Sequence, residues 1–306
     1  MSDVVFVGVS TRQSLVHRVW PRWQSVLGTA CGVRSLELGL GADDADFVRL
    51  LDRMRDDAGV AGAVVTAHKV RVFSAGQLCF ARLDPLALAC REVNAIRRAP
   101  DGLWGWARDP VSVGRVVDRI WPSPDGQVVC LGAGGTARAL AHHLASRRAV
   151  TFVAADRDPA AAGGLSRQLA GRLDVRVGEG PWDELVAAAP PGSLVVNATG
   201  MGKDRPGAPT SDAVRFPEAA VVWELNYRGQ LSFLAEARRQ AGARGLEVHD
   251  GWELFCHGWA AALGVVLGLA DDARLGDRLA RAAAAFRPSG QGTDDGGVTR
   301  AAGSGH

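Results

Sequence analysis

The segment VVCLGAGGTARALAHHLAS, residues 128–146, decides the fold class of this 306-residue chain. Val128–Leu131 is a short apolar run typical of a buried strand, Gly132–Gly135 predicts a tight turn, and Thr136–Ser146 has the apolar spacing of a helix. A glycine-rich turn alone can occur in an α/β domain that binds nothing. Between a strand and a helix, the same turn is typical of a dinucleotide-binding motif.

Each small residue of this motif has a physical role in the prediction. Gly132 permits the tight turn, Gly134 lets the backbone approach a pyrophosphate, and Ala137 allows the helix to pack closely on the strand. With Gly135 and Thr136, the start of the helix offers free N–H groups and a partial positive charge to phosphates. We therefore expect these five residues to bind a nicotinamide dinucleotide.

The end of the next predicted strand, Thr151–Ala155, normally selects between the two nicotinamide cofactors. Asp156 follows about 20 residues after the glycine turn, where a carboxylate would bind the ribose 2′-hydroxyl of NAD. Arg157 comes next, and an arginine there would suit the 2′-phosphate of NADP. The sequence therefore favours NAD and leaves NADP open.

Strand and helix patterns alternate along most of the chain, an arrangement that specifies a parallel sheet covered by helices. The turn-rich tetrad Ala99–Gly102 joins two short strand-like segments and predicts a strand pair. The expected strands are Val4–Val9, Ser35–Gly39, Gly62–Thr66, Glu92–Arg97, Leu103–Trp106, Val128–Leu131, Thr151–Ala155, Leu194–Asn197 and Val221–Leu225. Besides Thr136–Ser146, the expected helices include Ser14–Leu27, Asp43–Ala58, Phe233–Gly242, Trp252–Leu267 and Ala270–Phe286.

The composition, 47% hydrophobic and 22% charged with a formal net charge of +2, is typical of a packed globular protein. Acidic and basic residues are interspersed, so we expect no nucleic-acid partner. The five cysteines lack metal-ligand spacing, so we expect no metal site and a reducing compartment. The N-terminus runs into a predicted strand rather than a signal peptide, and no apolar run is long enough to span a bilayer. We therefore expect a cytoplasmic protein with no membrane partner, and a disordered tail at 287–306.

Several short motifs, in order over residues 3–285, resemble those of the shikimate/quinate dehydrogenase family. Each is weak alone, and their shared order makes the resemblance specific. Val65–Lys69 is similar to NVTxPHK, Glu92–Ala95 to GAVNT, Gly105–Asp109 to GxNTD, Leu131–Arg138 to LGAGGAAR and Asn197–Gly202 to NATxxGM, while Leu225–Tyr227 and Asp250–Gly251 match later markers.

The resemblance implies a two-domain α/β fold and reversible hydride transfer between a nicotinamide and a ring secondary alcohol. Residues 1–108, completed by helices within 250–286, would form the substrate-binding domain. Residues 109–249 would form a Rossmann-type, doubly wound cofactor domain. The resemblance leaves a homodimer open as the state of assembly. The further cofactor contacts implied are Asn197, Thr199 and Gly200.

Lys69 and Asp109 are the catalytic pair that the resemblance implies, and the chemistry agrees with it. Oxidation of an alcohol requires removal of its proton as hydride leaves the carbon. A lysine can hold and pass that proton while a carboxylate fixes its orientation and charge. Taken singly, Lys69 could be a solvated lysine and Asp109, which precedes Pro110, a helix cap. The substrate contacts implied are Ser14, Thr66, Asn94 and Tyr227.

The substrate side departs from the family pattern at several positions. The serine pair SxS is reduced to Ser14, and Ala107 and Arg108 replace the Asn and Thr of GxNTD. Gly258 stands where the family has a Gln that usually contacts ring hydroxyls, with His257 beside it. Arg108 or His257 could supply replacement substrate contacts, although a lone charged residue is more often on a solvated face.

A site built to hydrogen-bond one substrate group rejects ligands that lack it, so these losses predict a substrate decorated differently from shikimate. We therefore expect an NAD(P)-dependent dehydrogenase of specialised metabolism that acts on a shikimate or quinate analogue or a related cyclic polyol. Two alternatives stay open. One is an ordinary shikimate dehydrogenase, which interconverts 3-dehydroshikimate and shikimate, and the other is a non-catalytic relative that senses a ligand.

Overall fold

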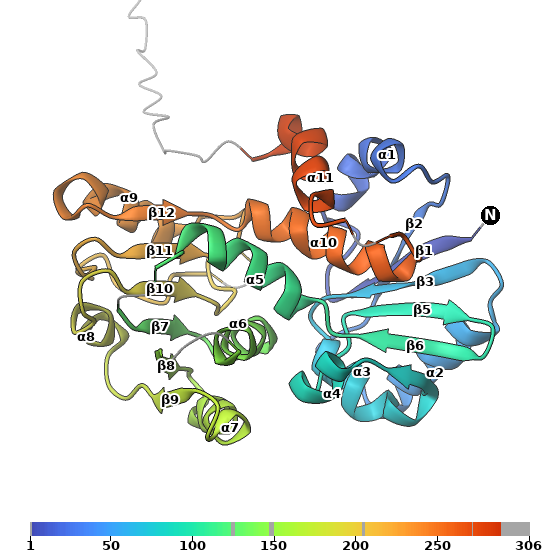
Figure 1. The fold of residues 1–306 in the computed structure, drawn as a ribbon, viewed down its shortest axis with the longest axis horizontal. Helices are drawn as coiled ribbons and strands as arrows, with labels where there is room; N and C mark the ends of the chain where they lie inside the picture. The colour runs from blue at the N-terminus through green and yellow to red at the C-terminus, as the bar shows by residue number, and fades with distance from the viewer. Residues whose placement is uncertain (1, 124–125, 147–149, 204–205, 271, 289–306) are drawn as a thin grey trace, which may run out of the picture.

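The computed structural model describes residues 2–123, 126–146, 150–203, 206–270 and 272–288. Two six-stranded sheets lie side by side, and helices bridge them along one face (Figure 1). The predicted fold class, a mixed α/β unit followed by a Rossmann-type unit, is confirmed.

The first sheet is mixed, with one strand antiparallel to the other five. Its elements in chain order are β1 (Asp3–Gly8), α1 (Val16–Leu27), β2 (Val33–Glu37), α2 (Asp44–Asp56), β3 (Val60–Val65), α3 (Lys69–Gly76), η1 (Gln77–Cys79), β4 (Phe80–Leu83), α4 (Pro85–Cys90), β5 (Ala95–Ala99) and β6 (Gly102–Trp106). The strand order is β2-β1-β3-β5-β6-β4. Helices cross over between β1, β2 and β3, which pair in parallel, while β3, β5 and β6 pair antiparallel. The predicted strand pair is therefore confirmed.

The second sheet is parallel throughout and doubly wound. Its elements are α5 (Asp109–Ile120), β7 (Val128–Leu131), α6 (Gly135–Ala145), β8 (Thr151–Ala155), α7 (Pro159–Leu169), β9 (Asp174–Val177), α8 (Trp182–Ala187), β10 (Leu194–Asn197), β11 (Val221–Glu224), α9 (Ser232–Arg244) and β12 (Glu247–His249). The order β12-β11-β10-β7-β8-β9 reverses between β7 and β10. Ligands of such sheets bind outside the carboxyl ends of the strands at that reversal, where the glycine turn lies.

The last helices return to the first sheet. They are α10 (Trp252–Val266), α11 (Leu275–Ala283) and the short η2 (Ala284–Phe286). Trp259 of α10 packs edge-on against Phe6 of β1, with ring centroids 4.9 Å apart, and also contacts Trp20 and Trp23 of α1. Because these large apolar side chains are buried together, α10 and α11 form part of the first core rather than the second.

Several predicted element boundaries differ from the structure, and the two largest differences at the start of an element are at β5 and α11. The strand expected from Glu92 begins at Ala95, because the preceding residues turn toward α3 and β6: the N–H of Val93 bonds the Lys69 carbonyl and that of Asn94 the Trp106 carbonyl, each at 3.0 Å. The helix expected from residue 270 begins at Leu275. Of the predicted tail, 289–306 lies outside the described residues.

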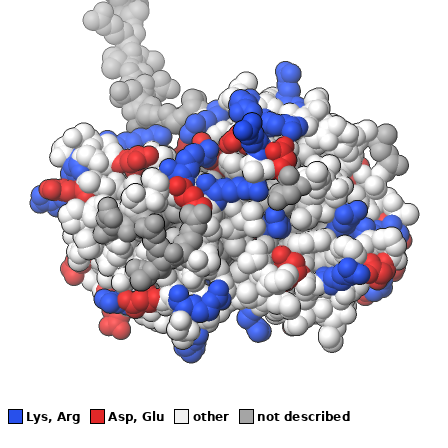
Figure 2. All heavy atoms as spheres, in the orientation of Figure 1, with Lys and Arg blue, Asp and Glu red and all other residues white. Residues whose placement is uncertain are grey.

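The described surface mixes both signs of charge. On the face in Figure 2, acidic and basic side chains are interspersed over both units. Within the described residues, no helix combines the length and apolar character needed to cross a membrane.

Candidate active site

Lys69 and Asp109 form an ion pair between Nζ and Oδ2, although 40 residues separate them in sequence. Lys69 is the first residue of α3, shortly after β3 ends, and Asp109 is the first residue of α5, shortly after β6 ends. Pro110 suits the first turn of α5, where its missing N–H costs nothing. The Lys69 side chain is only 10% exposed, so its ammonium is held by the protein rather than by water.

Asn94 completes this cluster from the turn before β5. Its Nδ2 donates to Oδ1 of Asp109, and its Oδ1 accepts the backbone N–H of Arg108 at 2.6 Å. Both carboxylate oxygens of Asp109 are therefore engaged, one by Lys69 and one by Asn94. Asn94 is predicted to bind a substrate hydroxyl, and in the structure its amide also donates to the Asp109 carboxylate.

Glu92 is a third charged group beside Lys69, and sequence reasoning missed it. Its side chain is fully buried, and Oε2 lies 3.8 Å from Nζ of Lys69. Burial raises the pKa of Glu92 to about 7, although the Lys69 charge opposes that shift. A signal was present in the sequence, because Glu92 stands where the motif GAVNT has an alanine.

The glycine turn after β7 has the space that a dinucleotide needs. Gly132 has a φ of +102°, and a Cβ there would lie 2.7 Å from the carbonyl atoms of Ala198, so only glycine fits. A Cβ on Gly134 would meet nothing within 4 Å, which leaves open space at the start of α6. Ala137 is buried in the core under α6, as predicted, and Thr136 is half-buried in its first turn.

Gly135 has a steric constraint in addition to its predicted phosphate contact. A Cβ on this residue would lie 2.2 Å from Cε of Lys69 and 3.0 Å from Oε2 of Glu92. The start of α6 therefore rests directly on Lys69. This contact joins the glycine turn of the second sheet to the predicted acid–base group of the first.

Asp156 holds the glycine turn in place. Its Oδ2 accepts the backbone N–H of Ala133 at 2.7 Å, and its Oδ1 accepts that of Asp158 at 3.0 Å. Each carboxylate oxygen thus has a backbone partner and keeps a second lone pair available to the predicted ribose contact. The adjoining Arg157 is exposed at the same edge of the sheet.

Asn197 supports the loop after β10 rather than facing a ligand, which corrects its predicted direct cofactor contact. It is fully buried, its Nδ2 donates to Glu224 at 2.5 Å, and its Oδ1 accepts the Thr199 hydroxyl at 2.7 Å. Glu224 also accepts the backbone N–H of Asn226 at 2.8 Å. Burial raises the pKa of Glu224 to about 7 against these hydrogen bonds. The network fixes the two loops that follow β10 and β11.

A cleft of about 700 Å³ lies between the two units. Thr199 and Gly200, which are predicted cofactor contacts, line this cleft. The predicted substrate contacts Ser14, Thr66 and Tyr227 line it as well. Burial raises the pKa of Tyr227, and the neighbouring Arg228 and Ser14 oppose that shift. The structure thus brings five predicted site residues to one cleft. Further lining residues include Gln13, Lys203, Arg228, Phe255 and Trp259.

His257 lies elsewhere, and its prediction as a substrate contact is wrong. Phe255 and Trp259, one turn apart on α10, face the cleft, so a residue midway between them points to the opposite side of the helix. The His257 ring packs beneath α11, with Nε2 3.3 Å from Oδ1 of Asp277. Burial lowers the pKa of His257.

Arg108 also misses the cleft, because it lines a separate cavity of about 390 Å³ with Arg97 and Arg115. The described cations that do line the cleft are Lys203 and Arg228. Both follow motifs already noted in the sequence, since Lys203 comes after NATxxGM and Arg228 directly follows Tyr227. Their positions beside those motifs could have identified them.

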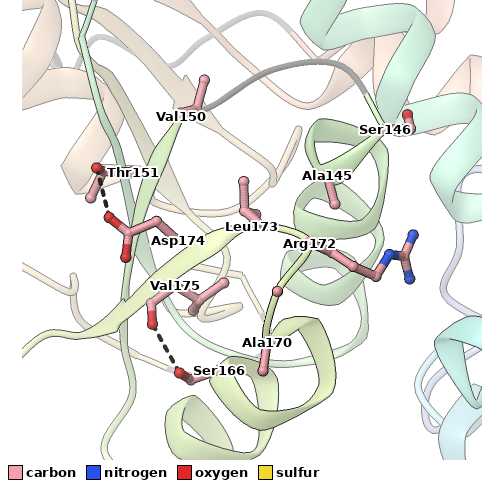
Figure 3. Close-up of a pocket in the computed structure, with 11 residues that line it drawn as sticks. Ala145, Ser146, Val150, Thr151, Ser166, Ala170, Arg172, Leu173, Asp174 and Val175 are labelled. Carbon is pink, nitrogen blue, oxygen red and sulfur yellow. Dashed lines mark hydrogen bonds between the residues drawn. The ribbon is translucent and has the colours of Figure 1, made fainter.

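A hollow of about 820 Å³ lies at the amino ends of β8 and β9 (Figure 3). Thr151 donates to Asp174 at 3.1 Å and Ser166 to the Val175 carbonyl at 2.9 Å, so these polar groups bond one another. It lies at the opposite end of the strands from the glycine turn, whereas doubly wound sheets bind ligands at their carboxyl edge. The interdomain cleft is therefore the candidate site.

The strand order, the glycine turn and the buried lysine–carboxylate pair define an NAD(P)-dependent dehydrogenase that acts on a CH–OH group. No family model matches the chain. The shikimate dehydrogenase (NADP(+)) of Anaeromyxobacter sp. (strain K) is 35% identical to it over 233 residues, which cover 75% of the chain and 80% of that protein. The chain belongs to the shikimate dehydrogenase family.

Solved structures share the fold across nearly the whole chain. Shikimate 5-dehydrogenase from Thermus thermophilus, in complex with NADP(H) and shikimate, has a TM-score of 0.71 at 23% identity and covers 93% of this chain and 99% of its own. Quinate dehydrogenase from Corynebacterium glutamicum, in complex with NAD, also has a TM-score of 0.71, at 21% identity, over 93% and 100% of the two chains. At these identities, the likeness shows the fold alone.

Proposed function

We propose that the protein interconverts a ring secondary alcohol and its ketone on a carboxylated cyclic polyol of the shikimate or quinate type. The observation that carries this proposal is the Lys69–Asp109 ion pair. Lys69 follows Ala67 of the cleft lining by two residues and contacts Gly135 of the glycine turn. Family membership supports the reaction class. The unit of residues 1–108, with α10 and α11, would bind the substrate, and the unit of 109–249 the cofactor.

The acid–base step belongs to Lys69. Burial lowers the pKa of its ammonium, and the carboxylates of Asp109 and Glu92 more than offset this, so the net pKa shift is upward. At neutral pH, Lys69 is therefore charged and can donate a proton to the carbonyl oxygen as the ketone is reduced. In the reverse direction, its neutral amine accepts the hydroxyl proton while Asp109 holds it in place.

The glycine turn would hold the cofactor, since Gly134 leaves open space at the N-terminus of α6 and Gly132 permits the turn. When bound, the nicotinamide supplies the hydride acceptor or donor. Arg157, which is exposed just after Asp156 at the end of β8, would contact the 2′-phosphate of NADP. With relatives named for NADP(+), this supports NADP over the NAD favoured by sequence. Arg157→Ala should shift the kcat/KM ratio toward NAD by about tenfold, and an unchanged ratio would contradict the assignment.

Ser14, Tyr227 and Arg228 would recognise the substrate carboxylate. The three side chains meet in one part of the cleft, where two hydroxyls and a guanidinium offer donors to a carboxylate. Arg228 would thus replace the second serine missing from the family's SxS pair. This combination favours an acid over a neutral cyclitol.

A substrate screen with both cofactors tests the proposed function. Shikimate, quinate, aminoshikimate and neutral cyclitols are compared in wild-type protein, Lys69→Met and Arg22→Met. We expect turnover of a carboxylated ring, a loss of about 100-fold or more in kcat for Lys69→Met, and a preserved kcat for Arg22→Met, which removes a positive charge at an exposed position of α1 outside the cleft lining. Turnover of shikimate at an ordinary KM would favour plain shikimate dehydrogenase. Cofactor binding without turnover of any compound would favour a ligand sensor.

A further inference from the structure

Glu92 occupies a place where a carboxylate needs strong compensation. It follows α4 in the turn before β5, its side chain is fully buried, and among the described residues neither oxygen has a hydrogen-bond partner. A buried carboxylate without partners is costly, and it is normally replaced or neutralised unless nearby positive charge offsets the loss of water.

The groups that face Glu92 supply that positive charge. Nζ of Lys69, on α3, lies 3.8 Å from Oε2, and the Cβ position of Gly135 lies 3.0 Å from the same oxygen, so the positive end of α6 adjoins it. Arg138 of α6 also attracts the carboxylate. The opposing groups are Asp109 of α5, whose charge repels that of Glu92, and the Cys90 thiol of α4.

We propose that Glu92 is a positioning residue for Lys69: together with Asp109 it holds the ammonium and fixes it against the glycine turn. This inference rests on the proposed function, in which Lys69 moves the proton. Glu92 does not touch the substrate, because no part of its side chain reaches the cleft surface. Its effect is to favour the charged form of Lys69 and to hold Nζ at a fixed position.

The sign of its effect on the reaction follows from charge. An opposite charge at this distance raises the pKa of an amine by roughly 1 to 3 units, so loss of the Glu92 charge lowers the pKa of Lys69. The alkaline limb of kcat/KM for ketone reduction, which needs the ammonium, then moves to lower pH. A residue that only filled space would leave that limb unmoved.

The chain offers a direct measurement, because it contains two lysines, Lys69 and Lys203. Protein labelled with ¹³C and ¹⁵N at lysine gives one set of side-chain NMR signals for each of the two lysines. The variant Lys203→Arg removes the Lys203 set and so assigns the remaining set to Lys69. We compare Glu92→Gln and Glu92→Ala, which both remove the charge, with Glu92→Asp, which keeps it, and with the exposed control Glu218→Gln.

We expect the Lys69 titration midpoint to fall by about one pH unit or more in both neutral variants. It should stay near wild type in Glu218→Gln and recover partly in Glu92→Asp, and the alkaline limb of kcat/KM should shift with it. An unchanged Lys69 midpoint in both neutral variants would overturn the proposal. If wild-type protein turned over none of the substrates while the midpoint still shifted, the proposed function would fail and the role of Glu92 in holding Lys69 would stand.

Discussion

Gly135→Ala is the substitution that most directly tests the contact between the two units. The φ angle of Gly135 is not in the left-handed region, so alanine is compatible with the backbone at the start of α6. The added methyl group would nevertheless lie 2.2 Å from Cε of Lys69 and 3.0 Å from both Nζ of Lys69 and Oε2 of Glu92. Carbon atoms pack at about 3.5–4.0 Å, so one partner must move.

The group that moves is Lys69, because its far end is flexible whereas Gly135 is fixed in a helix. Relief of the overlap requires a displacement of about 1 Å or more, which takes Nζ out of its position between Asp109 and Glu92. A misplacement of this size costs on the order of 100-fold in the rate of a reaction that depends on positioned groups. The fold should survive, since the strain falls on one side chain.

Stopped-flow and steady-state kinetics, together with calorimetric cofactor binding, separate the two outcomes. For Gly135→Ala we expect kcat to fall about 100-fold while cofactor affinity changes little. Gly134→Ala is the matched control, because its Cβ meets no protein atom and would instead enter the space assigned to pyrophosphate. It should weaken cofactor binding about tenfold or more and leave Lys69 in place. If Gly135→Ala lost cofactor affinity and kept kcat, the interpretation of Gly135 as a spacer for Lys69 would be refuted.

Three further variants test separate parts of the structure. The pKa of Glu92 is about 7 in the folded protein against an ordinary value of 4.5, so between these pH values the folded state binds a proton that the unfolded state does not. The free energy of unfolding therefore falls by up to about 1.4 kcal/mol per pH unit as pH rises through that window. Glu92→Gln should lack this component in urea unfolding at about pH 5 and about pH 8, and an equal change of unfolding free energy between the two pH values in wild type and variant would contradict it. Glu224→Gln should lower the free energy of unfolding by about 1–3 kcal/mol in the same assay. The Glu224 carboxylate accepts N–H bonds from Asn197 and Asn226, and the amide group of Gln would place a donor against one of those donors. An unchanged stability would argue against the network. A Cβ on Gly258 would meet nothing within 4 Å, and Gly258→Gln should raise kcat/KM for shikimate by about 2- to 10-fold relative to other ring acids. A loss of shikimate turnover would contradict this prediction.

The overall fold followed from sequence because it depends on patterns that act locally. Alternating apolar segments and the glycine turn after β7 predict a doubly wound sheet wherever they occur in that order. Lys69 and Asp109 could be paired because each lies in a motif, and the order of the motifs matches that of the family. The strand order and the glycine turn depend on backbone geometry, which is retained when other residues of the chain are substituted.

The neighbourhood of each side chain could not be read in the same way. Whether His257 faced the cleft depended on the rotation of α10, which is set by how Trp259 packs on β1 and α1. The bond from the N–H of Ala133 to Asp156 depends on the path of the turn, which the sequence pattern does not specify. Glu92 was overlooked because an acidic residue in a turn is usually solvated.

The return of α10 and α11 to the first sheet also sets the order in which the chain can mature. The Trp23 indole donates to the carbonyl of Leu279, so the first core is complete only after α11 has been made. The Rossmann unit is contiguous and can fold as soon as β12 emerges. The half that is synthesised first is therefore completed last, and a chain truncated after residue 250 should show a protease-resistant second unit beside a cleavable first one. Equal resistance of both halves at that length would show that the early strands do not wait for the C-terminal helices.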